Sequence, residues 1–365
     1  MTGLQIALDE RYATKDNLEK IAHIAPEARI VMFSIRLRFP FIRKVRGLLR
    51  RILPFSLYNL LSSILDRPSE AARMDWIDPP TFSDDMKNIL LFPPDLNNQL
   101  AKELLVNYRF HWVHSITTGV DHIPALPKDT LLTSSKGMHS RRIAEFTLGL
   151  IFALAKNIPQ HTLQTRKRLW KTLPSEMIQG SRLGIVGLGS IGTEVARLGK
   201  AVGMEVWATK RTMTNIEFVD RILTPKELPH LLREVDYLVL AVPLTRDTRY
   251  LIGKEELNMM KTTAYLINIS RGSIVDENFL YQALRKGSIR GACIDVFQNE
   301  KPLPKNNRFY KLPNLLITSY SAYYSGDSLG QVMDLFFENL RRFIAGDLLL
   351  NLADTVSNAT NNLTQ

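Results

Sequence analysis

The centre of the chain alternates short apolar runs with helical stretches, and this alternation limits the possible folds more than any other feature. Between about residues 140 and 320, the pattern repeats in units of roughly 30 residues, the length of a βαβ unit. Helices that cover both faces of a parallel sheet make its strands almost continuously apolar. The sequence therefore predicts an α/β domain with a buried parallel sheet. Expected strands are 183–187, 204–209, 237–242, 264–268 and 291–295, and expected helices are 140–155, 190–202, 225–234, 254–260 and 277–286.

The segments on either side of this centre point to a second domain. A chain of 365 residues is long enough for two domains. The first 135 residues alternate less regularly, with strand candidates at 4–8, 88–92 and 111–114. Apolar side chains share one helical face at 328–344, which predicts a helix there. The polar residues 355–365 are expected to fray.

Charge and cysteine content narrow the class of protein and its compartment. The net charge of +11 favours anionic partners. The single cysteine, Cys293, excludes a disulfide scaffold and a cysteine-rich zinc site, and no other spacing resembles a metal site. Asp9, Glu10 and Arg11 stand where a signal peptide needs an apolar core, and no apolar stretch reaches the ~18 residues of a membrane span. We therefore expect a cytoplasmic protein.

The segment 35–65 holds seven Arg or Lys residues and no acidic residue. Between Pro40 and Pro54 its apolar residues recur at helical spacing with the cations on the other face, which is the pattern of a basic amphipathic helix. Such a helix most often packs on its own domain. Weak contact with an anionic membrane through residues 40–54 is the second interpretation, and contact with nucleic acid is the third. We expect no specific nucleic-acid partner.

A glycine-rich motif, Gly187-Leu-Gly189-Ser190-Ile191-Gly192, follows an expected strand and opens an expected helix. In that setting Gly187 makes a tight turn, Gly189 lets the backbone approach a pyrophosphate, and Gly192 lets the helix pack close to the sheet. The N–H groups at the start of the helix, with Ser190 and Ile191, would then bind the phosphates. The motif predicts a dinucleotide site.

The residues after the next strand indicate which dinucleotide binds. An NAD site usually places a carboxylate there, about 20 residues past the glycines, to bind the ribose 2′-hydroxyl. Here the strand ends at Thr209 and is followed by Lys210 and Arg211. Two cations suit the 2′-phosphate of NADP, so we expect NADP. The alternative is that both cations are solvated and NAD binds.

Six further motifs follow one another in a characteristic order. They are Trp-Val-His-Ser-Ile-Thr-Thr-Gly-Val-Asp-His-Ile (112–123), Gly-Met-His-Ser-Arg-Arg-Ile-Ala-Glu (137–145), Val-Pro-Leu-Thr-Arg-Asp-Thr (242–248), Ala-Tyr-Leu-Ile-Asn-Ile-Ser-Arg-Gly-Ser-Ile-Val-Asp (264–276), Gly-Ala-Cys-Ile-Asp-Val-Phe (291–297) and Asn-Leu-Arg-Arg-Phe-Ile-Ala-Gly (339–346). With them, the chain from about Asn88 to Asp354 resembles the D-isomer-specific 2-hydroxyacid dehydrogenase family. The Gly-Met-His loop is most similar to the glyoxylate and hydroxypyruvate reductase branch.

This resemblance implies a fold and partners. It implies two Rossmann-like doubly wound domains with parallel sheets. Residues 138–320 would form the dinucleotide-binding domain. Residues 1–137 and 321–354, with the basic insertion at about 35–65, would form a discontinuous substrate domain to which the C-terminal helix returns. A small 2-keto or 2-hydroxy acid would be the substrate, and the protein would be a homodimer.

The resemblance also implies site residues. Arg271 would hold the substrate carboxylate and carbonyl with its planar guanidinium, although a solvated arginine after a strand is the alternative. The backbone near Thr118 and Gly119 would supply amide donors, and Glu300 matches the family's catalytic acid. The residues that would line the cofactor are Val242, Pro243, Thr248, Ile269 and Asp295, of which the last would orient the nicotinamide carboxamide.

The family's catalytic histidine is missing from this chain. The family pattern Thr-Pro-His corresponds to Thr318-Ser319-Tyr320, and all seven histidines lie at or before His230. Tyr320 therefore occupies the position. A phenol, with an ordinary pKa of ~10, can donate a hydrogen bond to a carbonyl oxygen but is a poor base at neutral pH. The alternative is a packing aromatic in an inactive site.

Two functions follow from these features. The first is reduction of a small 2-keto acid such as glyoxylate or hydroxypyruvate, with Tyr320 as the proton donor. Turnover would be slow, since loss of a proton-transfer group costs about 10²–10⁴-fold. The second is a cofactor-binding pseudoenzyme or sensor. Arg271 and Glu300 favour the enzyme, whereas Tyr320 and the basic insertion favour the binding protein.

Overall fold

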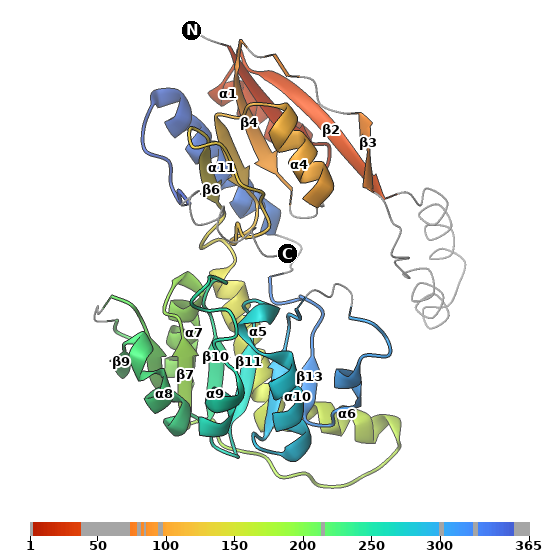
Figure 1. Ribbon diagram of the computed structural model, residues 1–365, viewed down its shortest axis with the longest axis vertical. Helices are drawn as coiled ribbons and strands as arrows, with labels where there is room; N and C mark the ends of the chain where they lie inside the picture. The colour runs from red at the N-terminus through yellow and green to blue at the C-terminus, as the bar shows by residue number, and fades with distance from the viewer. Residues whose placement is uncertain are drawn as a thin grey trace. The chain divides into compact units, whose positions relative to one another are not determined.

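The computed structural model describes residues 3–37, 74–78, 82–83, 85–93, 98–212, 216–298, 303–323 and 328–353. The chain forms two compact units, each with its own sheet (Figure 1). Unit 1 comprises residues 1–135 and 330–365, and unit 2 comprises residues 136–329. Glu300, the amphipathic segment 40–54 and the tail 355–365 lie outside the described residues. Among the helices of the described ranges, none is long and apolar enough to cross a membrane.

Unit 2 is built on a parallel seven-stranded sheet with the order β13-β12-β11-β10-β7-β8-β9. The strands are β7 (Arg182–Val186), β8 (Glu205–Thr209), β9 (Arg221–Leu223), β10 (Tyr237–Leu240), β11 (Tyr265–Asn268), β12 (Gly291–Ile294) and β13 (Leu315–Ile317). The central five confirm the sequence prediction, because they are buried and mostly apolar. The sequence does not predict the edge strands β9 and β13, since three residues are too few to show a pattern.

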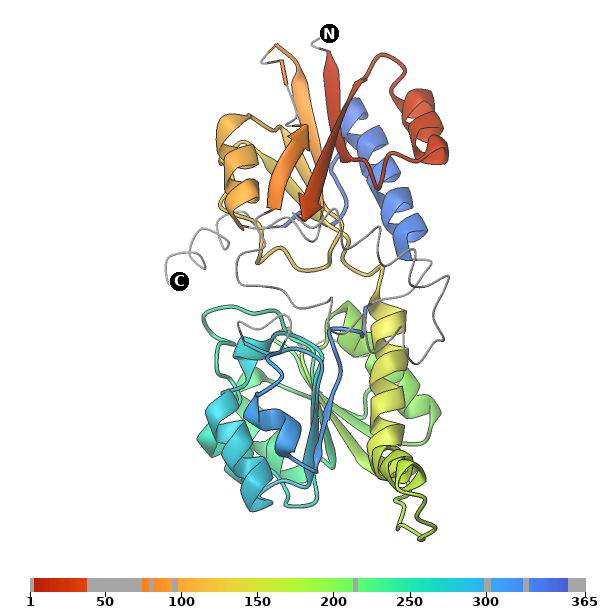
Figure 2. The same cartoon turned by 90° about the vertical axis from the view of Figure 1, so that its right-hand side faces the viewer.

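Helices cover both faces of this sheet, so unit 2 is doubly wound (Figure 2). They are α5 (Ser140–Ala155), α6 (Ile158–Arg166), α7 (Ser190–Ala201), α8 (Leu228–Glu234), α9 (Lys254–Met259) and α10 (Glu277–Lys286), with 3-10 turns η1 (Pro225–Glu227), η2 (Gly272–Ile274) and η3 (Arg308–Lys311). Ile185 and Ile267 face α5 and α7, whereas Val186 and Leu240 belong to the core beneath α8, α9 and α10. Successive strand residues point to opposite faces, which explains why these strands need continuous apolar runs.

Unit 1 holds a six-stranded sheet with the order β3-β2-β1-β4-β5-β6. Its elements are β1 (Leu4–Asp9), α1 (Lys15–Ile24), β2 (Arg29–Leu37), β3 (Met74–Asp78), β4 (Lys87–Phe92), α4 (Asn98–Asn107), β5 (Trp112–Ser115) and β6 (Leu131–Ser134). The predicted strands β1, β4 and β5 are confirmed. The sheet is parallel except at its edge, where β3 runs antiparallel to β2. Sequence reasoning missed β2, although residues 30–33 form an apolar run, and it missed β3, in which Asp75 and Asp78 interrupt the apolar pattern.

The C-terminal helix α11 (Ser328–Ala345) packs on unit 1, as the sequence predicts. Trp112 of β5 stacks on two of its side chains, with ring centroids 5.3 Å from Phe336 and 5.6 Å from Phe343. Phe336 is fully buried, but Ile344 is half-exposed, so the apolar face ends before the predicted last position.

After α11 the chain returns along the outer edge of β6. Leu352 pairs antiparallel with Thr133, and the N–H of Ala353 donates to the carbonyl oxygen of Leu132 at 2.8 Å. The N–H of Ser134 donates to the carbonyl oxygen of Asn351 at 3.2 Å. This short segment therefore covers the terminal strand of the unit 1 sheet.

Candidate active site

The glycine turn after β7 has the shape that a dinucleotide requires. Gly187 has φ +98°, and a Cβ there would lie 2.5 Å from Val242 and 2.8 Å from the carbonyl oxygen of Ala241. A Cβ at Gly192 would collide with the carbonyl oxygen of Gly187. At Gly189, by contrast, no described atom lies within 4 Å of an added Cβ. The turn is therefore tight where the chain must bend and open where a pyrophosphate would approach.

Helix α7 begins at this turn with its backbone N–H groups available. Gly189 is the N-cap, and no side chain of the described residues caps the helix. The first N–H groups of a helix have no acceptor within it. Those of Ser190, Ile191 and Gly192 therefore form a natural phosphate site, which fits the sequence prediction.

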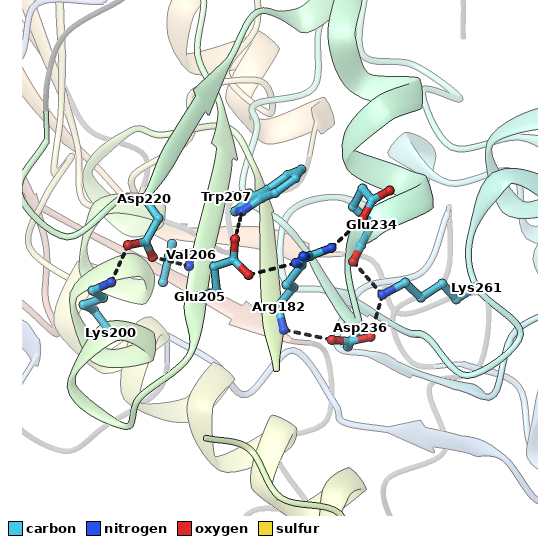
Figure 3. Close-up of polar contacts among 9 residues, drawn as sticks. All are labelled: Arg182, Lys200, Glu205, Val206, Trp207, Asp220, Glu234, Asp236 and Lys261. Carbon is cyan, nitrogen blue, oxygen red and sulfur yellow. Dashed lines mark hydrogen bonds and ion pairs between the residues drawn. The ribbon is translucent and has the colours of Figure 1, made fainter. Parts of the chain in front are cut away.

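Two cations follow β8 beside the turn, as the sequence indicates. The Lys210 ammonium donates to the carbonyl oxygen of Leu188 at 3.3 Å, so this side chain folds over the glycine turn, and Arg211 is exposed. The carboxylates of Glu205 and Asp220 lie at the opposite, amino-terminal end of β8, where Asp220 accepts from the N–H of Val206 (Figure 3). The carboxyl end of β8 is thus cationic.

The segment after β10 forms a closed turn. The Thr248 hydroxyl donates to the carbonyl oxygen of Pro243 at 2.6 Å and accepts from the N–H of Thr245 at 2.7 Å. Val242 packs against Gly187, as the hypothetical Cβ contact shows. Val242 therefore touches the glycine turn directly, whereas the Thr248 hydroxyl serves its own turn.

Arg271 follows β11 in a rigid turn. The Asn268 side chain donates to the Arg271 carbonyl oxygen at 3.0 Å and accepts from the N–H of Ser270 at 3.1 Å. The Arg271 guanidinium donates to the Ser270 carbonyl oxygen at 2.9 Å. Ile269 is buried in the apolar core beneath α5 and α7, so its contact there is packing.

Asp295 follows β12 and is only 4% exposed. Its carboxylate accepts three hydrogen bonds, all from the segment after β13. The donors are the Thr318 hydroxyl at 2.5 Å, the Ser321 N–H at 2.8 Å and the Ala322 N–H at 3.2 Å. The N–H of Tyr320 donates to the Asp295 carbonyl oxygen at 3.0 Å. Sequence reasoning placed Asp295 at the site but did not predict that its carboxylate binds the segment after β13.

Tyr320 lies inside that turn in the left-handed conformation, with φ +55°. Its ring meets the Tyr323 ring edge-on at 5.0 Å, and Tyr323 meets the buried His139 at 6.2 Å. Sequence reasoning missed Tyr323, because an isolated aromatic carries no chemical signal. Three aromatic side chains thus adjoin one another in the segment after β13 and at the start of α5.

The other predicted substrate residues lie in unit 1. Thr118 and Gly119 belong to the loop after β5, in which the Thr117 hydroxyl donates to the Gly119 carbonyl oxygen at 2.7 Å. The remaining predicted catalytic residue, Glu300, lies outside the described residues. Arg271, Asp295 and Tyr320 belong to unit 2.

The doubly wound sheet and its open glycine turn define unit 2 as a dinucleotide-binding domain. Residues 148–322 match the NAD binding domain of D-isomer specific 2-hydroxyacid dehydrogenases. A glyoxylate reductase of Korarchaeum cryptofilum is 34% identical over 253 residues, covering 66% of this chain and 75% of that protein. The chain therefore belongs to the D-isomer-specific 2-hydroxyacid dehydrogenase family.

Two further comparisons agree with this. A D-3-phosphoglycerate dehydrogenase of Methanocaldococcus jannaschii is 32% identical over 65% of this chain, but the match spans only 46% of that longer protein. The crystal structure of a family member from Aeromonas salmonicida superposes with a TM-score of 0.73 at 26% identity, covering 97% of this chain and 100% of the other. The fold of the described residues is thus that of a solved member of the family.

Proposed function

We propose that this protein is an NADP-dependent oxidoreductase that reduces a small 2-keto acid, such as glyoxylate or hydroxypyruvate, to the 2-hydroxy acid. One observation carries the proposal. Arg271, Asp295 and Tyr320 follow the adjacent parallel strands β11, β12 and β13, at the sheet edge that also holds the glycine turn. Ligands of open α/β sheets bind at this edge. The names of relatives such as the K. cryptofilum glyoxylate reductase support the substrate class.

The cations after β8 support NADP over NAD. Lys210 lies over the glycine turn and Arg211 is exposed beside it, so both are available to a 2′-phosphate. Gly187, Gly189 and the first residues of α7 would hold the pyrophosphate. Asp295 has about four acceptor sites on its carboxylate, of which three are used inside the protein. The last could accept from the nicotinamide carboxamide.

When bound, the nicotinamide supplies the hydride for C2 of the substrate. The Arg271 guanidinium would bind the substrate carboxylate, with the Thr118 and Gly119 amides as further donors. The Tyr320 hydroxyl would donate its proton to the C2 oxygen. Because a phenol is a poor base at neutral pH, the enzyme would favour reduction over the reverse oxidation. Glu300 would serve as the catalytic acid, the role that the resemblance to the family gives it.

The test is NADPH oxidation with glyoxylate and with hydroxypyruvate by the wild type, Tyr320→Phe and Tyr320→His. Tyr320→Phe should lower kcat about 10²-fold or more if the hydroxyl is the proton donor. Tyr320→His should raise kcat. Equal rates for the wild type and Tyr320→Phe would remove Tyr320 from the chemistry. NADPH binding without turnover on any keto acid would select the second candidate, a cofactor-binding pseudoenzyme, which the missing histidine favours.

We further propose that the protein is a homodimer through unit 2. Five large apolar side chains between residues 158 and 177 are more than half exposed: Ile158, Leu163, Leu169, Trp170 and Met177. Such a concentration on a soluble monomer is unusual and marks an interface. Analytical ultracentrifugation should show a dimer that Trp170→Ser weakens. A wild-type monomer at micromolar concentration would contradict the proposal.

We also propose a cytoplasmic location, with weak contact to anionic membranes through residues 40–54. The location is supported by the single, buried Cys293. The membrane contact is supported by the spacing of cations and apolar residues alone. Sedimentation with phosphatidylserine vesicles, compared with neutral vesicles, tests it.

A further inference from the structure

Ser135 is the last residue of unit 1 before the chain enters unit 2, and it is fully buried. Its N–H donates to two carbonyl oxygens, that of Ser115 at the end of β5 at 3.0 Å and that of Thr117 in the following loop at 3.1 Å. Its hydroxyl also donates to the Ser115 carbonyl oxygen, at 2.9 Å. β5 and β6 are parallel neighbours, so both carboxyl ends lie at one edge and Ser135 reaches the loop directly.

A row of buried, hydrogen-bonded side chains leads from Trp112 to the Ser135 hydroxyl. The Trp112 indole, which can only donate, gives its N–H to the Thr133 hydroxyl at 2.8 Å. Thr133 lies 2.7 Å from Nδ1 of His114, and Nε2 of His114 lies 3.4 Å from the Ser135 hydroxyl. Burial lowers the pKa of His114 to about 3, so the imidazole is neutral at physiological pH.

One arrangement of protons satisfies all of these contacts. The Thr133 hydroxyl accepts from Trp112 and donates to Nδ1 of His114. The neutral imidazole then carries its proton on Nε2, facing the Ser135 oxygen, and the Ser135 hydroxyl donates to the Ser115 carbonyl oxygen. Ser135 is thus held in place by a buried hydrogen-bond network.

The hydrogen bonds continue into the loop that carries Thr118 and Gly119. The Ser115 hydroxyl lies 3.0 Å from the Thr117 hydroxyl, which in turn donates to the Gly119 carbonyl oxygen at 2.7 Å. Thr117 therefore restrains the backbone before and after Thr118. Its carbonyl oxygen accepts from the N–H of Ser135, and its hydroxyl donates to the carbonyl oxygen of Gly119. The direction of the Thr118 and Gly119 N–H groups depends on these bonds.

We propose that Thr117 and Ser135 are positioning residues, which hold the Thr118 and Gly119 N–H groups in the orientation that binds the substrate carboxylate. The assignment of those two amides to the substrate rests on the proposed function. The positioning itself does not, because it is a property of unit 1 alone.

The test compares Thr117→Val, which removes the hydroxyl at nearly constant volume, with Thr130→Val. Thr130 is a threonine whose hydroxyl donates to the Phe110 carbonyl oxygen at 2.8 Å, at the other end of β6, and it is more deeply buried than Thr117. Thr117→Val should raise the KM for the keto acid several-fold to about tenfold, the effect of one lost hydrogen bond, with an unchanged KM for NADPH. Thr130→Val should change neither KM, and Thr117→Ser should restore the wild-type values.

Hydrogen exchange provides a readout that needs no substrate. Thr117→Val and Ser135→Ala should accelerate exchange of the 117–119 amides, whereas Thr130→Val should not. If Thr117→Val and Thr130→Val give the same exchange at 117–119, the positioning is refuted. If exchange responds as expected but the keto-acid KM of an active enzyme does not, the loop does not bind the carboxylate. If the wild type reduces no keto acid, the proposed function fails, and the exchange data alone decide the positioning.

Discussion

The backbone N–H of Tyr320 donates to the carbonyl oxygen of Asp295, whose carboxylate also binds the residues on both sides of that tyrosine. A left-handed conformation costs an ordinary residue roughly 1–2 kcal/mol. Asp295 offsets this cost by accepting the donors that the turn directs inward. The backbone around Tyr320 is therefore held by the residue that follows the neighbouring strand β12.

This relationship predicts the effect of Asp295→Asn. An amide presents N–H groups to at least one buried donor, which should lower the free energy of unfolding by about 1–3 kcal/mol. It should also lower kcat, because Tyr320 loses its support. Asp276→Asn is the matched control, since Asp276 caps α10 and asparagine caps as well. Urea denaturation measures the free energy of unfolding of both variants, and steady-state kinetics measures their kcat. Equal losses of unfolding free energy in the two variants would contradict the role given to Asp295.

The glycine turn predicts opposite behaviour for two alanine variants. Gly189→Ala should leave the melting temperature of the free protein unchanged, because the space around it is open among the described residues, yet weaken NADPH binding about tenfold or more, or ~1.4 kcal/mol. Gly192→Ala should destabilise the free protein by about 1–3 kcal/mol, because its Cβ collides with Gly187. Thermal melts with and without NADPH separate the two effects. A stable Gly192→Ala would show that α7 can shift.

Cofactor choice should follow Lys210 and Arg211. Replacing either by alanine should raise the KM for NADPH about 10–100-fold, the equivalent of one charged hydrogen bond, and leave the KM for NADH nearly unchanged. Lys200→Ala is the control, because Lys200 pairs with Asp220 at the far end of the sheet. Steady-state kinetics with both cofactors is the measurement. A loss of NADH affinity as large as that of NADPH would point to a general effect on the fold.

Acid should weaken the ion-pair cluster at the amino end of the unit 2 sheet (Figure 3). The hydrogen bond from Arg182, at 2.8 Å, and a second from the Trp207 indole lower the pKa of Glu205. A carboxylate with a lowered pKa in the folded state stabilises the fold above its ordinary pKa of about 4.3, and this stabilisation disappears as the pH falls through the lower value.

We therefore expect the free energy of unfolding of Glu205→Gln to lie below that of the wild type near neutral pH. The gap should narrow as the pH falls below about 4.3. Glu19→Gln is the control, because the pair that Glu19 forms with Lys15 at 3.8 Å is exposed, and such pairs contribute little. Urea denaturation over a pH series gives both curves. A gap that stays constant with pH would mean that Glu205 is not stabilised by its charge.

The parts of the fold that sequence reasoning predicts are those with continuous or periodic burial. β10 and β11 are buried on both faces and read as apolar runs, whereas β3 carries Asp75 and Asp78 and gives no such signal. The glycine turn was predictable because each glycine has a steric role that follows from its position between a strand and a helix. The family motifs located Arg271, Asp295 and Tyr320 in the sequence, but not what their side chains contact.

The contacts that sequence reasoning missed join residues far apart in the chain. The Asp295 carboxylate binds donors more than twenty positions later, at 318–322, and nothing local indicates which of several serines and threonines will donate. Likewise, Ser135 and Thr117 are ordinary loop residues until β5 and β6 lie side by side. Hydroxyl side chains serve turns, caps and buried networks equally well, so their role emerges only from packing.

The pairing of residues 351–353 with β6 has a practical consequence. A terminal strand with unpaired amides is a template for adhesion between molecules, and here a few residues after α11 occupy it. Shortened versions of the protein should therefore keep everything through Ala353, since trimming a few positions further would uncover that strand and invite aggregation without touching any residue of the proposed chemistry.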